Sequence, residues 1–517
     1  MMKTTNLGAM IDTRHGGEQT AFIAPLADGT AQEITFAELN ARADGIGRAL
    51  LARGHRTGER VAILGRNSID YIASLLGILR AGLVAVPINF KFPSDTLENI
   101  LRDSGARLLL GDADQLSRAT ANDLPRVVFN STGDDGLAAF IDPGVLAPFP
   151  AGPEDLALLL YTSGSTGMPK GVRLTHASHA WVVRTRLATH ELEGERVLIA
   201  APLYHMNALA LVLLTLASHV ATVLLPQFNA RDYINAITRY RCSWLTAVPP
   251  MIAMMLQEKD LLARSDLSCV RVVRMGSAPV TDSLFQQIGQ LLPKARIINA
   301  YGTTEGGPVV FAPHPDGIPT PRQAAGVAHP QVSLRLRDPQ GREAARGILE
   351  LKSPGLMQGY HQRPDLRPPF TDDGYYITGD VFARDEQGFY TFIGRLDDMF
   401  VSGAENIYPS EVEHLIERHP AVQQACVVPI ADEIKGTKPV AFVILRPGQR
   451  AGADELKAFT LSRGAAYLHP RHIWLVDAFP LAGTNKIDRR ALLLEAERRI
   501  HQDGALPQAN SGAQHGI

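Results

Sequence analysis

The chain has 517 residues, of which 45% are apolar and 20% are charged, and its formal net charge is −2. This composition is typical of globular proteins and excludes wholesale disorder, while the length predicts about two to four domains. This net charge gives no overall positive potential that would indicate binding to nucleic acid. The few cysteines exclude a disulfide scaffold and a thiolate metal cluster and favour a reducing cytoplasm; they are Cys242, Cys269 and Cys426.

Up to residue 150 the sequence alternates between helical and strand patterns. Apolar spacing predicts a helix over residues 35–54, with Thr35 and Glu38 placed as a capping box. The further segments, in chain order, are a strand at 60–64, a helix at 71–81 and strands at 83–89 and 106–112.

The alternation continues to about residue 330. The most apolar stretch, 208–225, is interrupted by polar residues, whereas a spanning helix needs about 20 predominantly apolar residues. It therefore predicts a buried helix to Ala217 followed by a strand over 220–225, in a soluble protein with no integral membrane segment and no signal peptide. Strands are predicted at 197–203, 221–226, 243–250 and 270–276, each followed by a helix, which indicates a largely parallel sheet covered on both faces.

After about Gln331 the pattern changes to β-rich hairpins at 332–353 and 374–395, and a new α+β pattern follows. The predicted fold class is α/β. We expect a large N-terminal domain (1–396) of mostly parallel sheets flanked by helices with a β-rich subdomain, then a small mobile α+β C-terminal domain (397–500). The polar segment 501–517 is predicted to be a disordered tail.

The strongest local motif is YTSGSTGMPKGV, from Tyr161 to Val172, which follows an apolar strand. Gly164 and Gly167 let backbone amides approach an anion, and Lys170 supplies a compact positive charge for a phosphate. Gly171 follows the lysine, so this is not a Walker A loop. Hydroxyl donors come from Thr162, Ser163, Ser165 and Thr166.

The chain resembles the adenylate-forming superfamily of acyl- and aryl-CoA synthetases, luciferases and peptide-synthetase adenylation domains. The loop above matches the phosphate-binding signature of that family, and six further motifs follow in the family's order over about residues 35–494. They are PLYHMNAL (202–209), GSAPV (276–280), NAYGTTEGGPV (299–309), YITGD (376–380), GRLDDMFVSGAENIYPSEVE (394–413) and PLAGTNKIDRRAL (480–492).

The nucleotide-binding residues follow from these motifs. Glu305 offers a carboxylate suited to Mg²⁺, Thr304 beside it can donate to the α-phosphate or the substrate carboxylate, and the Tyr301 ring can stack on adenine. Asp380, read as the end of a strand, and Arg395 are the ribose contacts that the resemblance implies. It also implies ATP or AMP contacts from Gly276, Ser277, Ala278, Pro279, Asn299, Ala300, Gly302 and Thr303.

The resemblance makes Lys486 the catalytic lysine that stabilises the charge developing as pyrophosphate leaves. Asn485 stands where the family often has glycine. Asp397 is the implied hinge about which the small domain rotates between two half-reactions. The implied tunnel for the pantetheine arm contains Gly403, Ala404 and Glu405, with alanine in place of the family's second glycine, and the candidates for coenzyme A phosphates are Lys435 and Lys438.

The acyl pocket is expected to include His205, Met206, Leu209, Met251, Gly302 and Gly307. This set is apolar and has no obvious carboxylate-binding arginine, which favours a monoacid over a dicarboxylate. Glycine at 307, where aryl-CoA synthetases of the halobenzoate type carry a large side chain, predicts a deeper pocket than benzoate needs. Medium or long fatty acids and extended aromatic acids are both open.

The predicted function is that of an AMP-forming carboxylic acid–CoA ligase that uses ATP, Mg²⁺ and coenzyme A. One alternative is a free-standing adenylation enzyme that loads a carrier protein; another is a non-catalytic acyl-adenylate binding protein, against which the presence of Lys486 argues. A P-loop mechanical ATPase is disfavoured by the missing GK[ST]. The oligomeric state is open, with a homodimer among the forms considered.

Overall fold

A computed structural model of the chain describes residues 5–26, 28–119, 123–162, 168–278, 280–366, 369–403, 405–482 and 486–504. The chain divides into two compact units, one of Met1–Val280 with Leu284–Phe392 and the other of Thr281–Ser283 with Ile393–Ile517. The main division after Phe392 lies four residues before the predicted boundary at 396.

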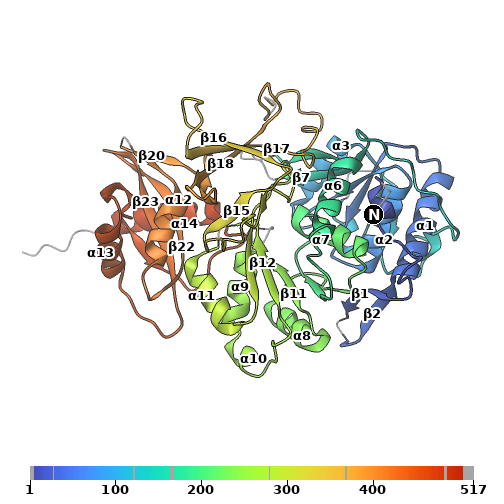
Figure 1. Ribbon diagram of the computed structural model, residues 1–517, viewed down its shortest axis with the longest axis horizontal. Coiled ribbons are helices and arrows are strands. Elements are labelled where there is room, and N and C mark those ends of the chain that lie inside the picture. The colour runs from blue at the N-terminus through green and yellow to red at the C-terminus, as the bar shows by residue number, and fades with distance from the viewer. Residues whose placement is uncertain are drawn as a thin grey trace, which may run out of the picture. The chain divides into compact units, whose positions relative to one another are not determined.

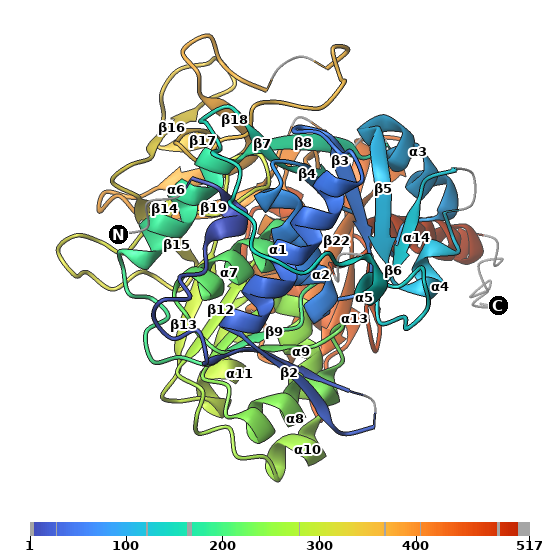
Figure 2. The same cartoon turned by 90° about the vertical axis from the view of Figure 1, so that its right-hand side faces the viewer.

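Two largely parallel sheets form the body of the first unit (Figures 1 and 2). One has the strand order β6-β5-β3-β4-β7-β8, in which only β7 and β8 pair antiparallel. Its strands are β3 (Arg60–Leu64), β4 (Val84–Pro87), β5 (Ala106–Gly111), β6 (Arg126–Val128), β7 (Leu156–Thr162) and β8 (Lys170–Thr175).

The other parallel sheet has the order β13-β12-β11-β9-β10-β1-β2, with an antiparallel pair only at β1 and β2. Its strands are β1 (Thr20–Pro25), β2 (Ala31–Thr35), β9 (Val197–Ile199), β10 (Thr222–Leu224), β11 (Trp244–Ala247), β12 (Val272–Gly276) and β13 (Arg296–Ala300). The expectation of mostly parallel sheets is confirmed.

Helices cover both faces of each sheet, as the alternation predicted. Strand β3 shows why its sequence is apolar throughout: Val61 and Ile63 join the core shared with the second sheet, while Ala62 and Leu64 face another core. The helices are α1 (Phe36–Ala52), α2 (Ile69–Arg80), α3 (Ser94–Ser104), α4 (Ala113–Leu116), α5 (Leu137–Phe140), α6 (His176–Leu187), α7 (Met206–Ala217), α8 (Ala230–Tyr240), α9 (Pro249–Gln257), α10 (Lys259–Ala263) and α11 (Asp282–Leu291).

Local signals in the sequence account for several of these boundaries. The capping box predicted at the start of α1 is present, because the Thr35 side chain accepts from the Glu38 amide and the Glu38 carboxylate accepts from the Thr35 amide. The apolar stretch 208–225 is the buried helix α7 followed by β10, as predicted. Within the described ranges, no helix is both long enough and apolar enough to cross a bilayer.

The β-rich subdomain is an antiparallel sheet with the order β14-β15-β19-β18-β17-β16 (Figure 1). Its strands are β14 (Phe311–Ala312), β15 (Ala324–Ala328), β16 (Ser333–Arg337), β17 (Arg346–Lys352), β18 (Tyr376–Arg384) and β19 (Tyr390–Arg395). The predicted hairpins at 332–353 and 374–395 are therefore confirmed.

The second unit contains a sheet in the order β21-β20-β23-β22, with β24 added on β23. Its elements are β20 (Phe400–Ser402), β21 (Glu405–Ile407), α12 (Pro409–Glu417), β22 (Val422–Asp432), β23 (Gly436–Leu445), α13 (Ala453–Arg463), β24 (Ile473–Leu475) and α14 (Arg489–Gly504). Helix α14 continues four residues into the predicted tail, where Arg498 bonds both Glu495 and Gln502 along one face. Residues 505–517 lie outside the described ranges.

Candidate functional site

The Ser/Thr/Gly-rich motif forms the connection between strands β7 and β8. Thr162 ends β7 and pairs directly with Lys170, which begins β8. The expected donors Ser163, Gly164, Ser165, Thr166 and Gly167 lie outside the described residues. The hairpin register thus brings Thr162 and Lys170 of the motif opposite each other.

Lys170 and Glu305 meet through a residue that no motif singled out, Tyr360. The Lys170 ammonium lies over the Tyr360 ring, 4.7 Å from its centroid, and the Tyr360 hydroxyl donates to Glu305 Oε1 at 3.1 Å. A cation over the face of an aromatic ring is attracted by the ring quadrupole. The three side chains therefore present an ammonium and a carboxylate on either side of one phenol.

Strand pairing explains why Tyr360 reaches this position. The segment 358–361 runs beside β8: Gln358 donates to the Arg173 carbonyl at 2.9 Å, Val172 forms an antiparallel bridge with Tyr360, and His361 donates to the Gly171 carbonyl at 2.7 Å. About 190 residues of sequence separate Tyr360 from Lys170. No spacing signal could have identified it, because the contact arises from long-range pairing.

The YGTTE motif forms a tight turn directly after β13. Thr303 and Gly307 form an antiparallel bridge, and the Gly306 amide donates to Thr303 Oγ1 at 2.7 Å. The Glu305 carbonyl accepts from the Met357 amide at 2.9 Å, which ties the turn to the β-rich subdomain. The predicted contact residues of this stretch are all partly accessible to solvent: Asn299, Ala300, Tyr301, Gly302, Thr303, Thr304 and Glu305.

Tyr301 and Asp380 are brought together across two elements. The Tyr301 hydroxyl donates to Asp380 Oδ2 at 2.5 Å, and the Tyr301 ring packs edge-on against Phe382, with 4.9 Å between the ring centroids. Burial raises the pKa of Tyr301 far above its usual value, and the Asp380 carboxylate raises it further. The phenol therefore stays protonated and is held as a donor.

The expectation that Asp380 ends a strand is wrong. Asp380 is buried inside β18, where extra residues around Gly379 (φ +72°) interrupt the pairing with β17. The Asp380 amide donates to Thr378 Oγ1 at 3.0 Å, and Thr378 Oγ1 donates to the Leu349 carbonyl at 2.8 Å. The bulge, rather than a strand end, fixes the position of the carboxylate.

The GSAPV motif begins at the carboxyl end of β12. A Cβ at Gly276 would lie 2.9 Å from the Ala300 carbonyl oxygen, so this position admits only glycine without a backbone shift. Ser277 follows with φ +66°, a left-handed conformation that is uncommon for a residue with a side chain. Ala278 is described and partly accessible, whereas Pro279 lies outside the described residues.

The expected acyl-pocket residues on helices α7 and α9 belong to two hydrophobic cores. Met206 and Leu209 are buried in the core shared by the two parallel sheets, whereas Met251 is buried in a second core beneath α8 and α9. Met206 Sδ lies 3.1 Å from His179 Nε2, and the His205 ring packs against Tyr204, with 4.5 Å between the centroids.

Gly307 does not open empty volume as the sequence argument assumed. Its φ is +82°, and a Cβ there would lie 3.0 Å from the Gly355 carbonyl oxygen. The turn conformation and the close approach of Gly355 therefore explain the glycine. A larger side chain at 307 would strain the backbone, so pocket depth cannot be inferred from this position.

In the second unit, Lys486 is exposed beside a bridge between Leu481 and Ile487, and its carbonyl accepts from the Ala482 amide at 2.7 Å. The following helix is anchored where Arg489 donates to both Glu413 oxygens at 2.6 and 2.9 Å. Asn485 lies outside the described residues. The base from which the lysine projects is thus firmly held.

The other expected residues of this unit lie in its strands and in the connections between them. Arg395 ends β19 and Asp397 lies in the connection from β19 to β20, with 3.9 Å between Arg395 Nη2 and Asp397 Oδ2. The Gly403 amide (φ +67°) donates to the Lys435 carbonyl at 2.8 Å, so these two tunnel candidates meet. Glu405 begins β21 and is exposed, Lys438 pairs with Asp432 at 3.3 Å, and Ala404 lies outside the described residues.

The acidic residues determine which metal ion the site could hold. No group of three His, Cys, Asp or Glu residues suited to a metal ion occurs in the part of the chain that is described. Glu305 Oε1 accepts one hydrogen bond from Tyr360, which leaves further lone pairs on the carboxylate. Mg²⁺ keeps several waters and usually takes one or two protein carboxylates together with substrate phosphates, so a single carboxylate at this place fits.

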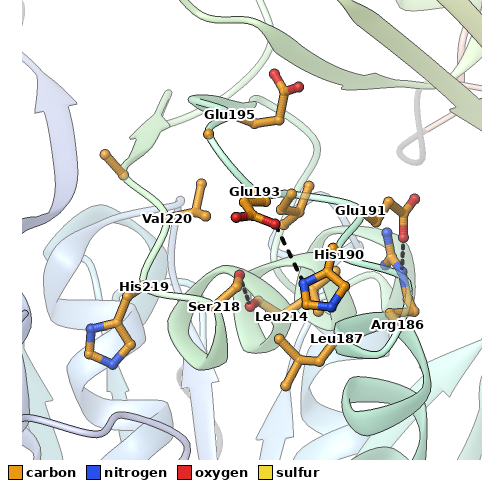
Figure 3. A pocket seen from close by; sticks show the side chains of 13 residues that line it. Arg186, Leu187, His190, Glu191, Glu193, Glu195, Leu214, Ser218, His219 and Val220 are labelled. Carbon is orange, nitrogen blue, oxygen red and sulfur yellow. Dashed lines mark hydrogen bonds and ion pairs between the residues drawn. The ribbon is translucent and has the colours of Figure 1, made fainter. Parts of the chain in front are cut away.

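A surface hollow of about 450 Å³ lies apart from all these motifs, between the ends of α6 and α7 (Figure 3). Figure 3 shows Arg186 paired with Glu191, at 2.9 Å between Nε and Oε2, and the neighbouring His190 near Glu193. None of the residues proposed from the sequence lines this hollow.

Comparisons with known proteins agree with the order of the motifs. The sequence model of the "AMP-binding enzyme" family matches residues 12–361, and that of the "AMP-binding enzyme C-terminal domain" matches residues 411–486. A feruloyl-CoA synthase from Amycolatopsis is 33% identical over 464 residues, covering 89% of this chain and 93% of the relative. A fatty acid–[acyl-carrier-protein] ligase, ScoC, from Streptomyces coeruleorubidus is 31% identical over 92% of this chain and 94% of its own.

The structure also resembles solved structures over nearly its whole length. The crystal structure of the anthranilate CoA ligase AuaEII in complex with anthranoyl-AMP has a TM-score of 0.86 at 26% identity, and the match covers 97% of this chain and 99% of that chain.

Proposed function

The chain belongs to the AMP-binding enzyme family of adenylate-forming acyl-CoA ligases, and we propose that it joins an extended carboxylic acid to coenzyme A in two steps. In the first, the substrate carboxylate attacks the α-phosphate of ATP, giving acyl-AMP and pyrophosphate. In the second, the thiol of coenzyme A attacks the acyl carbonyl and AMP leaves. Both nucleophiles come from the substrates, so the protein contributes positioning and charge stabilisation.

The arrangement of Lys170, Tyr360 and Glu305 is the observation that carries this proposal. An ammonium and a carboxylate held 4.7 Å and 3.1 Å from the ring and hydroxyl of one tyrosine suit a polyphosphate and its counter-cation. In this assignment Lys170 neutralises phosphate charge and Tyr360 orients Glu305. The loop from Ser163 to Gly167 would donate to the same phosphates.

Glu305 would hold Mg²⁺, which would neutralise phosphate charge that otherwise repels the incoming carboxylate. Thr304, in the same turn, would donate to the α-phosphate or the substrate carboxylate. Asp380 would accept from the ribose hydroxyls while Tyr301 donates to its Oδ2 and holds it in place. Gly276, Ser277 and Ala278 would present backbone to adenine at the end of β12.

The second unit would serve both steps by rotating. Lys486 would approach the α-phosphate during adenylation, and Asp397 would be the hinge. The Gly403 turn, fixed to Lys435, would face the pantetheine arm during thioester formation. Each of these residues is exposed or lies in a turn. Such positions suit residues whose contacts must change as the unit rotates.

The substrate is proposed to be a medium- or long-chain fatty acid or an extended aromatic acid. The relatives support both classes, since one is named a feruloyl-CoA synthase and the other a fatty acid–[acyl-carrier-protein] ligase. The second name also favours a rival acceptor, a carrier protein in place of coenzyme A. The three cysteines are free thiols, which supports the proposal of a reducing cytoplasm.

A direct test measures AMP release with ATP, a panel of fatty and aromatic acids and either coenzyme A or a phosphopantetheinylated carrier protein. We expect AMP and thioester to form in equal amounts with coenzyme A. Thioester on the carrier alone would assign the rival function. AMP release that no acid stimulates would refute both.

A further inference from the structure

An arginine lies inside the first unit beside the motifs proposed for the acyl group. Arg274 Nη1 donates to Asn207 Oδ1 at 3.4 Å, which links strand β12 to the first turn of α7. Asn207 is the second residue after His205, and Arg274 precedes Gly276 by two residues on the same strand face. Figures 1 and 2 both show α7 alongside β12. The sequence argument, which found no arginine here, missed this contact.

The strand next to β12 adds two polar side chains on the same face. Thr246 pairs with Arg274 in parallel register, and Trp244 pairs with Val272. Trp244 and Val272 pack in the core that contains α7, whereas Leu245 and Val273 belong to the core on the opposite face. The alternation of side chains along a strand therefore directs Trp244 and Thr246 to the side of α7.

These groups carry hydrogen-bonding atoms that have no partner among the described residues. Trp244 is 0% exposed and Thr246 1% exposed, yet no described residue bonds Trp244 Nε1, Thr246 Oγ1 or Asn207 Nδ2. An arginine has only donors, so Arg274 fixes the Asn207 amide with Oδ1 toward itself and Nδ2 away. Leaving a buried polar atom unpaired costs about 1–3 kcal/mol, and here several occur together.

The unused atoms are donors in surroundings that carry positive charge. Arg186, 7% exposed, bonds Glu191 through Nε, while its buried Nη2 has no partner among the described residues. Burial and, to a smaller extent, the nearby Arg186 lower the pKa of Arg274 to about 10, against the opposing effect of Glu191. The Glu191 carboxylate is thus near three guanidinium groups, those of Arg186, Arg274 and Arg296, and Arg274 remains charged at neutral pH.

We propose that Arg274, Asn207, Thr246 and Trp244 bind a hydrogen-bond-accepting oxygen at the end of the acid substrate remote from its reacting carboxylate. This inference rests on the proposed function. Two residues of strand span about 6.6 Å, so a group held at Arg274 lies well below the end of β12, and a short acid cannot reach it. The substrate class is then an extended acid with a distal phenolic or carboxylate oxygen, rather than a plain fatty acid.

Matched acids test this on the full chain. 4-Hydroxycinnamate is compared with 4-methylcinnamate, and octanedioate with octanoate, by kcat/KM with ATP and coenzyme A and by calorimetric binding without coenzyme A. We expect the oxygen-bearing acid of at least one pair to be preferred about 10- to 100-fold, the range for a hydrogen bond to a charged group. The pair that shows the preference distinguishes a phenolic from a carboxylate oxygen.

Substitutions test whether the cluster of Arg274, Asn207, Thr246 and Trp244 causes this preference. Arg274→Met should bring the kcat/KM ratio of the oxygen-bearing acid to its matched acid close to one in each pair. The nearly isosteric Thr246→Val should lower this ratio about threefold to tenfold without loss of folding. Arg271→Met is the matched control, since Arg271 precedes the same strand but pairs with Glu195 at the exposed surface. It should leave the ratio unchanged.

The two readouts separate this inference from the proposed function. Selective binding of the oxygen-bearing acids without thioester formation would refute the function and uphold the cluster. If thioester forms but the oxygen-bearing acid is not preferred over its apolar partner in either pair, the proposed function stands and the proposed role of the cluster is refuted. A ratio that survives in both Arg274→Met and Thr246→Val would overturn it as well.

Discussion

The Tyr301 hydroxyl donates a 2.5 Å hydrogen bond to Asp380 Oδ2, joining the turn after β13 to the bulge in β18. Asp380 is 3% exposed, and a buried carboxylate is costly unless its oxygens are hydrogen-bonded. Two residues assigned to opposite sides of a nucleotide, one to the base and one to the ribose, thus position each other. Removing either partner should disturb the other.

Tyr301→Phe should lower the free energy of unfolding by about 1–3 kcal/mol, because the buried carboxylate loses a donor while the ring remains. The raised pKa keeps the phenol protonated, so its contribution is fully present below its usual pKa near 10 and is lost only as pH rises through its folded value. The loss in Tyr301→Phe should therefore be constant from pH 7 to 9 in urea unfolding. Tyr375→Phe, whose ring lies beside Arg335, is the control, and an equal loss there would contradict the prediction.

Tyr360→Phe and Tyr360→Leu should separate the two contacts of this residue. The phenylalanine keeps the ring under Lys170 but loses the hydroxyl bonded to Glu305, so we expect it to raise the Mg²⁺ concentration needed for ATP–pyrophosphate exchange. The leucine removes both contacts and should also raise the KM for ATP. Mg²⁺ titrations at saturating ATP measure the first effect. An unchanged Mg²⁺ requirement in both variants would remove Tyr360 from the site.

Lys486→Ala should reduce ATP–pyrophosphate exchange by about 10²–10³, the usual cost of one preorganised charge donor. Conversion of supplied acyl-AMP and coenzyme A to thioester should continue, since the lysine is assigned only to adenylation. Lys457→Ala, in an ion pair with Asp454 on α13, provides the control. Equal loss of both half-reactions would be incompatible with this role.

Asp397→Pro should impair one half-reaction far more than the other, because proline fixes φ near roughly −65° and a hinge residue must change its dihedral angles. Asp397 is exposed, and no backbone hydrogen bond from its amide is described, so the fold should tolerate the change. Leu396→Pro, one position earlier in the same turn, is the comparison. Normal turnover in Asp397→Pro would move the pivot elsewhere.

His176 and His179 should make the first unit sensitive to acid. Burial is the main cause that lowers the pKa of each to about 4, and the neighbouring His176 contributes to the lowering at His179. The unfolded chain binds these protons near the usual 6.5, so the stabilisation is complete above about pH 6.5 and is lost as pH falls toward 4. For His179 the difference corresponds to about 3 kcal/mol.

Urea unfolding at pH 7 and pH 4.5 checks this. His179→Leu should flatten the dependence of unfolding free energy on pH by about 2–3 kcal/mol across that interval. The exposed His15→Gln is the control and should keep the wild-type dependence. A parallel fall in His179→Leu and wild type would show that other groups govern the acid response.

Local sequence determined most elements, because their causes are local. The apolar run of β3 and the capping box of Thr35 and Glu38 depend on neighbours within a few residues, and both occur as predicted. The order of the family motifs likewise identified the family before any coordinates, since each motif is a continuous stretch.

Tertiary structure decided which side chains meet. Tyr360 reaches Lys170 through pairing of 358–361 with β8, and Arg274 reaches Asn207 because β12 lies beside α7. Both contacts join segments far apart in sequence, and their partners follow from register and packing rather than from any spacing. The same reason explains two wrong predictions, the strand end at Asp380 and the empty volume at Gly307. A bulge surrounds Asp380 and the Gly355 carbonyl approaches Gly307, and neither feature can be predicted from the adjacent residues.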